Sequence, residues 1–138
     1  MSFSAQVERM AKVANARMIA TFQQSTQEVI NTAQTPTAQG GRIRVDTGFL
    51  RNSGRASLVD FPVGPTRPQP GAQYDWSANE QDMVLTVANA ELGDTVYFGW
   101  TADYARIREV HDGFLQGAVK DWPQIVSRNA ASARARIK

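Results

Sequence analysis

The stretch Val45–Ser53, VDTGFLRNS, decides between two fold classes, because it contains the Asp-Thr-Gly tripeptide of aspartic proteases. In those all-β enzymes the Asp lies in a tight loop after an apolar strand, and two such carboxylates share one proton. Here the preceding residues alternate between charged and apolar, and two bulky apolar residues follow the glycine directly. This pattern predicts a short helix over residues 48–53, with Asp46 or Thr47 as its N-cap. We therefore expect Asp46 to have a structural role rather than a catalytic one.

Long helices are predicted at both ends of the chain. Over residues 4–33 apolar side chains recur at steps of three, four or seven, which places them on one helix face. This stripe, which we expect to be core, consists of Phe3, Val7, Met10, Ala14, Met18, Phe22 and Val29. Ser4 is the expected N-cap of this helix. A second helical pattern covers residues 114–137, where Pro123 either opens a separate helix or kinks a continuous one.

Strands are predicted between these two helices. Residues 55–61 alternate in the manner of a strand. The runs 83–88 (MVLTVA) and 95–100 (TVYFGW) are rich in strand-forming residues and are separated by turn residues, which predicts a β-hairpin. A short helix is expected over residues 104–110, with Asp103 as its cap.

The segment 62–81 holds four of the six prolines and has no periodicity, so we expect it to project as a stiff, extended arm. Tyr74 and Trp76 near its end are expected to anchor the arm, either to its own domain or to a neighbour. The order of elements predicts one α+β domain over residues 1–138. It has a small antiparallel sheet, the long N-terminal and C-terminal helices packed on one face, and the proline-rich extended arm.

Composition excludes several function classes. The chain of 138 residues has no cysteine, which excludes disulfides, thiol catalysis and thiolate metal sites and suits a reducing cytoplasm. Its single histidine, His111, cannot supply a metal site built on histidine pairs. No glycine cluster precedes a Lys-Ser or Lys-Thr pair, so a phosphate-binding loop is not predicted. No apolar run approaches the roughly 18 residues that cross a bilayer, and the first residues lack the apolar block of a signal peptide. We expect no metal, no cofactor and no membrane association.

Charge is distributed unevenly along the chain. Residues 1–45 carry five basic and two acidic side chains (+3), residues 46–105 carry three and eight (−5), and residues 106–138 carry seven and three (+4). One interpretation is an ordinary solvated surface. Another is self-association, in which a basic face of one copy meets an acidic face of the next. Basic ends would also suit proximity to DNA phosphates.

Three segments, taken in order, resemble one known family. The first is Val45–Ser53, which leads into a strand. The second is Val96–Gly99, which leads through Tyr104–Arg106 to Glu109. The third is Gly113–Leu115, which opens the final helix. This order resembles the tail-completion (minor tail, neck) proteins of long-tailed bacteriophages, the family that includes the lambda tail-completion protein Z. Their pattern is roughly Asp-Thr-Gly-x-Leu-Arg-x-Ser, a hairpin, Tyr-Ala-x-x-x-Glu-x-Gly, and then Gly-Phe and a helix.

The chain departs from the family pattern at two places. His111 and Asp112 stand where the family often has Gly and a small residue after the Glu. The proline-rich arm is also longer than the family leads one to expect.

The resemblance implies a non-enzymatic virion component of the phage neck, assembled in the cytoplasm of the bacterial host. Such proteins form a ring, with six copies as the expected number, between the head-closure (stopper) protein and the tail terminator or tail tube protein. Viral DNA passes through the lumen of the ring without sequence recognition. A small domain must meet copies of itself on two sides to close such a ring.

On this interpretation Arg51 is expected to face either a partner or an internal carboxylate such as Glu109. The residues expected at interfaces between subunits are Arg51, Tyr74, Trp76, Tyr97, Tyr104 and Arg106.

Two alternatives stay open from the residues alone. A small nucleic-acid-binding module using the basic C-terminal helix predicts an affinity that falls steeply with salt. Against it, this helix lacks aromatic side chains interleaved with the basic residues at 134–138. An enzyme of the aspartic-protease type would lose all activity when Asp46 is replaced by Asn. A ring-forming protein would lose only a helix cap, at a cost of about 1 kcal/mol.

Overall fold

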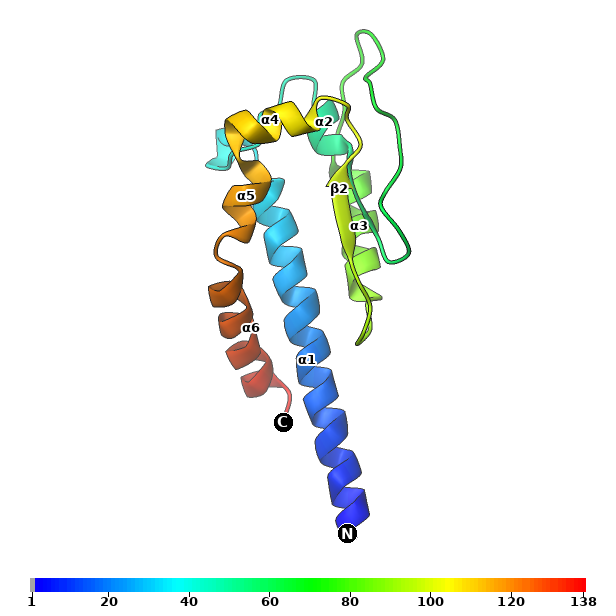
Figure 1. Ribbon diagram of the computed structural model, residues 1–138, viewed down its shortest axis with the longest axis vertical. Helices are drawn as coiled ribbons and strands as arrows, with labels where there is room; N and C mark the ends of the chain where they lie inside the picture. The colour runs from blue at the N-terminus through cyan, green and yellow to red at the C-terminus, as the bar shows by residue number, and fades with distance from the viewer. Residues whose placement is uncertain (1) are drawn as a thin grey trace.

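The first helix, α1, is the longest element of the fold. In the computed structural model, which describes residues 2–138, α1 spans Phe3–Ala33, as the periodicity predicted. Its cap is Ser2 rather than Ser4, since the Ser2 hydroxyl accepts a hydrogen bond from the Ala5 backbone N–H at 3.2 Å. At 1.5 Å per residue the helix is about 46 Å long. Figure 1 shows its N-terminal part extending well beyond the rest of the chain.

The sheet has two strands. Strand β1 (Gly54–Ser57) pairs in antiparallel register with β2 (Tyr97–Trp100), so that Gly54 faces Trp100 and Ser57 faces Tyr97. The predicted strand over residues 55–61 therefore ends early. The Ser57 hydroxyl explains this, because it accepts hydrogen bonds from the backbone N–H groups of Val59 and Asp60 and turns the chain.

The predicted hairpin between residues 83–88 and 95–100 is wrong. Residues 83–88 belong to a helix, α3 (Ser77–Ala88), and β2 pairs with β1 instead. A strand would bury Met83, Leu85 and Val87 together, but Leu85 is exposed. Met83 and Val87, four residues apart on one helix face, are the buried pair. Burial of Met83 and Val87 on one helix face therefore outweighs the preference of these residue types for a strand.

The proline-rich arm spans residues 58–76, with no helix or strand, and is displaced from the predicted 62–81 because residues 77–81 begin α3. In Figure 1 the arm loops along the side of the chain opposite α6 and projects past α4. Its middle is held by the segment after β2. The Thr101 hydroxyl donates to the Pro65 carbonyl at 2.7 Å, and the Asp103 backbone N–H donates to the Thr66 carbonyl at 2.9 Å.

The remaining elements are η1 (Thr37–Gln39), α2 (Phe49–Asn52), α4 (Ala105–Asp112), α5 (Phe114–Val119) and α6 (Trp122–Arg136). Gly113, with φ +65°, separates α4 from α5. Pro123 lies in the first turn of α6, so it opens a separate helix, which was the first of the two predicted alternatives. Asp103 does not cap α4, whose N-cap position is Tyr104; its carboxylate pairs with Arg67 at 2.7 Å.

Two buried clusters form the core, and the α+β class predicted from the sequence is confirmed. Helix α3 packs against β1, while α1 packs against α3, α5 and α6. The residues of one cluster are Ile30, Trp76, Met83 and Val87. The residues of the other are Ile43, Phe49, Leu50, Ala102 and Phe114.

Candidate interaction surface

The Asp-Thr-Gly segment determines the backbone conformation at the start of α2. Gly48 has φ +85° and is the residue from which α2 starts. A Cβ at this position would stand 2.4 Å from the Tyr74 carbonyl oxygen, so only glycine lets the two backbones approach this closely. The Thr47 hydroxyl accepts from the Phe49 backbone N–H at 3.3 Å, whereas Asp46 is exposed and makes no such bond. Of the two predicted caps, Thr47 thus reaches the first turn and Asp46 does not.

Asp46 has no second acid beside it in the lining of its hollow within one copy. Asp46 borders a hollow of about 360 Å³, whose lining also includes Arg44 and Arg108. The described lining contains no second carboxylate with which Asp46 could share a proton. A catalytic carboxylate pair of the aspartic-protease type needs two acids in direct contact. One copy therefore offers no dyad at the tripeptide, and the second acid would have to come from another copy.

Three of the six predicted interface residues turn inward. Trp76 is 3% exposed and belongs to the core of its own subunit. The prediction that it lies at a subunit interface is therefore wrong. The Tyr74 hydroxyl accepts from the Gln69 backbone N–H at 2.9 Å, and its ring meets that of Phe49 edge-on at 5.2 Å. These two aromatics anchor the arm to its own domain, which is one of the two predicted alternatives.

Arg51 also bonds within its own chain, but to a different partner from the one expected. Its Nε donates to the Gln34 backbone carbonyl at 2.8 Å. Glu109 caps α5 instead, because its carboxylate accepts from the backbone N–H groups of Leu115 (2.8 Å) and Gln116 (2.9 Å). The predicted pairing of Arg51 with Glu109 is therefore wrong.

The other three predicted residues reach the surface at two places. Tyr104 is half-buried against Phe49, and burial, followed by repulsion from nearby carboxylates, raises its pKa above the ordinary value. Arg106, close by on α4, is exposed and has no hydrogen bond or ion pair within residues 2–138. Tyr97 lies at the far end of β2 from Trp100, where its ring meets that of Phe61 edge-on at 5.2 Å. The structure thus brings Tyr74 and Tyr104 together around Phe49, and places Tyr97 elsewhere.

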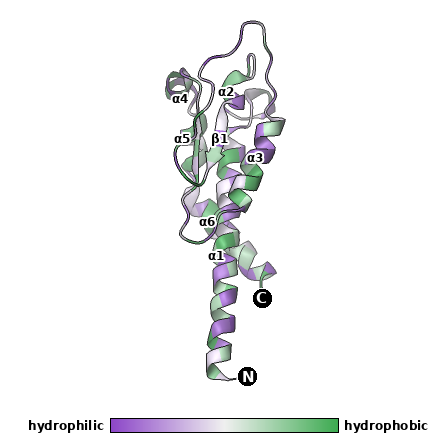
Figure 2. Cartoon of the chain, turned by 90° about the vertical axis from the view of Figure 1, so that its right-hand side faces the viewer, coloured by the Kyte–Doolittle hydropathy of each residue, from purple (hydrophilic) through white to green (hydrophobic). Residues whose placement is uncertain are grey.

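The apolar stripe of α1 was predicted to be core, and its first half is not. Phe3 is 81% exposed and Met10 is 71% exposed, and Val7 and Met18 are exposed as well. The reason lies at the other end of the chain. The Nε of Arg17 donates to the backbone carbonyl of Ile137 at 2.7 Å, so the C-terminal segment meets α1 at that level. Figure 2 shows apolar residues along the part of α1 that extends past the C-terminus.

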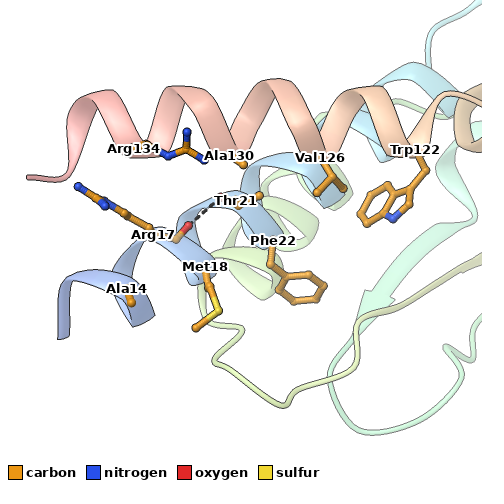
Figure 3. Close-up of a pocket in the computed structure, with 9 residues that line it drawn as sticks. All are labelled: Ala14, Arg17, Met18, Thr21, Phe22, Trp122, Val126, Ala130 and Arg134. Carbon is orange, nitrogen blue, oxygen red and sulfur yellow. Dashed lines mark hydrogen bonds between the residues drawn. The ribbon is translucent and has the colours of Figure 1, made fainter. Parts of the chain in front are cut away.

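A groove continues this stripe into the body of the protein. It consists of three adjoining hollows of about 540, 540 and 530 Å³, which share Ala14 and Arg17 at one junction and Phe22 and Trp122 at the other. Its floor is α1, and α6 forms one wall. Figure 3 shows Met18, Phe22, Val126 and Trp122 along its central part, with Arg17 and Arg134 at one end. We call this feature, from Gln6 to Ala33 along α1, the α1 groove.

Basic side chains surround the α1 groove. Helix α6 carries Arg128, Arg134 and Arg136 and no acidic residue. Arg128 pairs with Glu28, and Arg136 donates to the Gln24 side chain at 2.9 Å. Arg134 has no hydrogen bond or ion pair within the described part of the chain. Of the basic residues of this helix, Arg134 lines the α1 groove, while Arg128 and Arg136 are engaged with Glu28 and Gln24 of α1 outside it.

No group of three or more His, Asp and Glu within residues 2–138 is placed to hold a metal ion. None of the described helices is long and apolar enough to cross a membrane.

Comparison with known proteins finds no match for this chain. No family model matches the chain, and neither does any curated protein or any solved structure.

Proposed function

We propose that this chain is a structural virion protein of a long-tailed bacteriophage, which forms a ring in the neck between the head-closure protein and the tail terminator or tail tube. One observation carries the proposal. The first segment that resembles tail-completion proteins is far in the sequence from the second and third, which follow each other closely, yet each contributes side chains to the same cluster. Phe49 and Leu50 come from the first segment, Tyr104 and Ala105 from the second, and Phe114 from the third. Segments that build one core are expected to be inherited together as one structural module.

The surface supports assembly rather than catalysis. Soluble proteins that work as monomers rarely expose a continuous apolar surface on the scale of the α1 groove and its projecting stripe. The acidic central part of the chain and its basic ends provide two complementary surfaces, which a closed ring of identical copies requires. In this function the protein has no substrate and no cofactor. Six copies surround the DNA channel, and basic side chains near the lumen meet phosphates without reading sequence.

The test is to remove the chain from particle assembly. In a phage or prophage that carries the coding sequence, disruption of this gene is expected to yield DNA-filled heads and separate tails, seen by negative-stain electron microscopy. Addition of the purified chain to the mixed heads and tails is expected to restore joined, infective particles. The Asp46→Asn variant is expected to restore joining as well as the wild type does. Joined and infective particles formed without the chain would refute the proposal.

A further inference from the structure

Residues 2–138 leave the α1 groove open, and its chemistry defines what would fit. It is lined mainly by apolar side chains, and the charged residues at its edges are Arg9, Arg17 and Arg134. An occupant must therefore offer apolar side chains beside a negative charge. Burial of the apolar groups drives docking, and the charge pairing selects the partner and its orientation.

The proline-rich arm presents such a segment. Val59, Phe61 and Val63 are 88%, 76% and 87% exposed, three large apolar side chains within five residues. Asp60 lies among them; its carboxylate accepts only the Phe61 backbone N–H, at 2.7 Å, and has no basic partner within residues 2–138. Pro62 restricts the backbone at this point, which lowers the entropy lost when the segment becomes immobile. The Phe61 ring is held edge-on against Tyr97, so it is presented in a defined place.

Charge excludes the simplest alternative, in which two copies pair their α1 grooves about a two-fold axis. The charged residues that line the α1 groove are Arg9, Arg17 and Arg134, and none of its lining residues is acidic. Two such surfaces would repel each other. The segment 59–63 of the arm carries one charged side chain, the carboxylate of Asp60. Complementary charge therefore favours contact between unlike faces of two copies.

The positions of the two surfaces also suit repeated assembly. In Figure 1 the arm runs along the side of the chain away from α6, whereas side chains of α6 line the central hollow of the α1 groove. A copy that inserts its arm into a neighbour still has its own groove free for the next arm. Contacts of this head-to-tail type generate rings when the rotation closes.

We propose that residues 59–63 of one copy dock into the α1 groove of a second copy, with Asp60 facing Arg134. This inference rests on the proposed function in one respect: it identifies the contact between adjacent copies of the ring. Phe61 is the central anchor, and the interface is heterologous.

Cysteine trapping tests the contact, because the chain has no cysteine of its own. A Val63→Cys chain and an Ala130→Cys chain are mixed under mild oxidation and separated on a non-reducing gel. The matched control pairs Val63→Cys with Val110→Cys, a position on α4 that is exposed and lies outside both surfaces. We expect the Val63–Ala130 heterodimer to exceed both homodimers and the control pair. A chain carrying both Val63→Cys and Ala130→Cys is expected to give a ladder of oligomers.

Two further variants separate specific docking from chance collision. Phe61→Asp on the arm or Met18→Asp in the groove is expected to weaken the association about thirtyfold, the size of effect found for loss of a central interface anchor. Val110→Asp, the same change at an equally exposed apolar site, is expected to leave it unchanged. Mixing Phe61→Asp chains with Met18→Asp chains is expected to restore one-to-one association, because each retains the surface that the other has lost. Circular dichroism checks that each variant folds.

Several results would overturn the inference. One is a heterodimer yield no higher than that of the control pair. A dominant Ala130–Ala130 homodimer would show two-fold pairing of grooves instead. Trapping of the groove cysteine only by another virion protein would assign the groove to that protein. If trapping fails while particles still need the chain to join heads to tails, the inference falls and the proposed function stands. If trapping succeeds while particles join without the chain, the proposed function falls instead.

Discussion

Gln34 joins α1 to α2 and β2, and its replacement by methionine is expected to destabilise the whole domain. The Gln34 side chain is 2% exposed. Its Nε2 donates to the Arg51 carbonyl at 2.8 Å, and its Oε1 accepts from the Trp100 indole Nε1 at 2.9 Å. Methionine has a similar length and keeps the backbone carbonyl of residue 34, which accepts from the Arg51 guanidinium. Only the two side-chain hydrogen bonds are lost.

The size of the effect follows from the two groups left without a partner. A buried polar group that loses its hydrogen bond costs about 1–3 kcal/mol, and the Arg51 carbonyl and the Trp100 N–H are both affected. Trp100 is only half-buried, so its share lies near the lower end. We expect the free energy of unfolding to fall by about 3 kcal/mol. For 138 residues the average entropy of unfolding is about 0.29 kcal/mol/K, so Tm falls by about 10 °C.

Urea denaturation and thermal circular dichroism measure this loss. Gln81→Met is the control, because Gln81 is exposed on α3; its free energy of unfolding should change by less than about 0.5 kcal/mol. In a Trp100→Phe background the Gln34→Met change should cost about 1 kcal/mol less, since no indole N–H is left unpaired. A loss below about 1 kcal/mol for Gln34→Met, or the same loss in both backgrounds, would refute this account of the junction.

Three further predictions concern the Asp-Thr-Gly region. In urea denaturation, Gly48→Ala is expected to lower the free energy of unfolding by about 3 kcal/mol and Gly40→Ala by about 1 kcal/mol. A left-handed backbone strains alanine at both positions, but of these two only position 48 would also bring a Cβ against the Tyr74 carbonyl. Equal losses for the two variants would contradict this explanation. Asp46→Asn is expected to change the free energy of unfolding by less than about 0.5 kcal/mol, since Asp46 is exposed and caps no helix; a loss near 2 kcal/mol would show a contact that the structure lacks. Burial, and then repulsion from two carboxylates, raise the pKa of Tyr104 above 10.0. The stability that its neutral form contributes is therefore present below the unfolded-state pKa, and it is lost as pH rises through the folded-state pKa. In a spectrophotometric titration, Tyr104→Phe should remove absorbance change from the alkaline end of the curve, and an unchanged alkaline end would exclude this shift.

The sequence predicted the fold class because its strongest signals are local. The 31-residue helix α1 has no Pro or Gly, and the break at Gly113 requires a left-handed backbone that glycine adopts easily. The misassigned segment is MVLTVA, residues 83–88, whose residue types favour a strand. It is helical because Met83 and Val87 pack beside Trp76, and no local pattern reports that contact.

The candidate site was harder to predict, for a related reason. Periodicity identifies which side chains of α1 share a face, but it does not report whether another element covers that face. Coverage depends on where the C-terminal segment meets α1, and that contact joins Arg17 to Ile137, 120 positions apart. The buried Gln34 had no signal at all, since a glutamine at the end of a helix is ordinarily solvated.

The overhang of α1 beyond Arg17 has a consequence for assembly. Isolated helices of this length are marginal in water, because most helical stability in proteins comes from packing of the apolar face. In a lone subunit the first turns therefore unwind at low free-energy cost, and Phe3, Val7 and Met10 then no longer form a stripe. A neighbour that docks along this surface must also supply the order that the free chain lacks. In the proposed ring, this ordering cost weakens the contact between free copies, and it is offset once a neighbour covers the first turns.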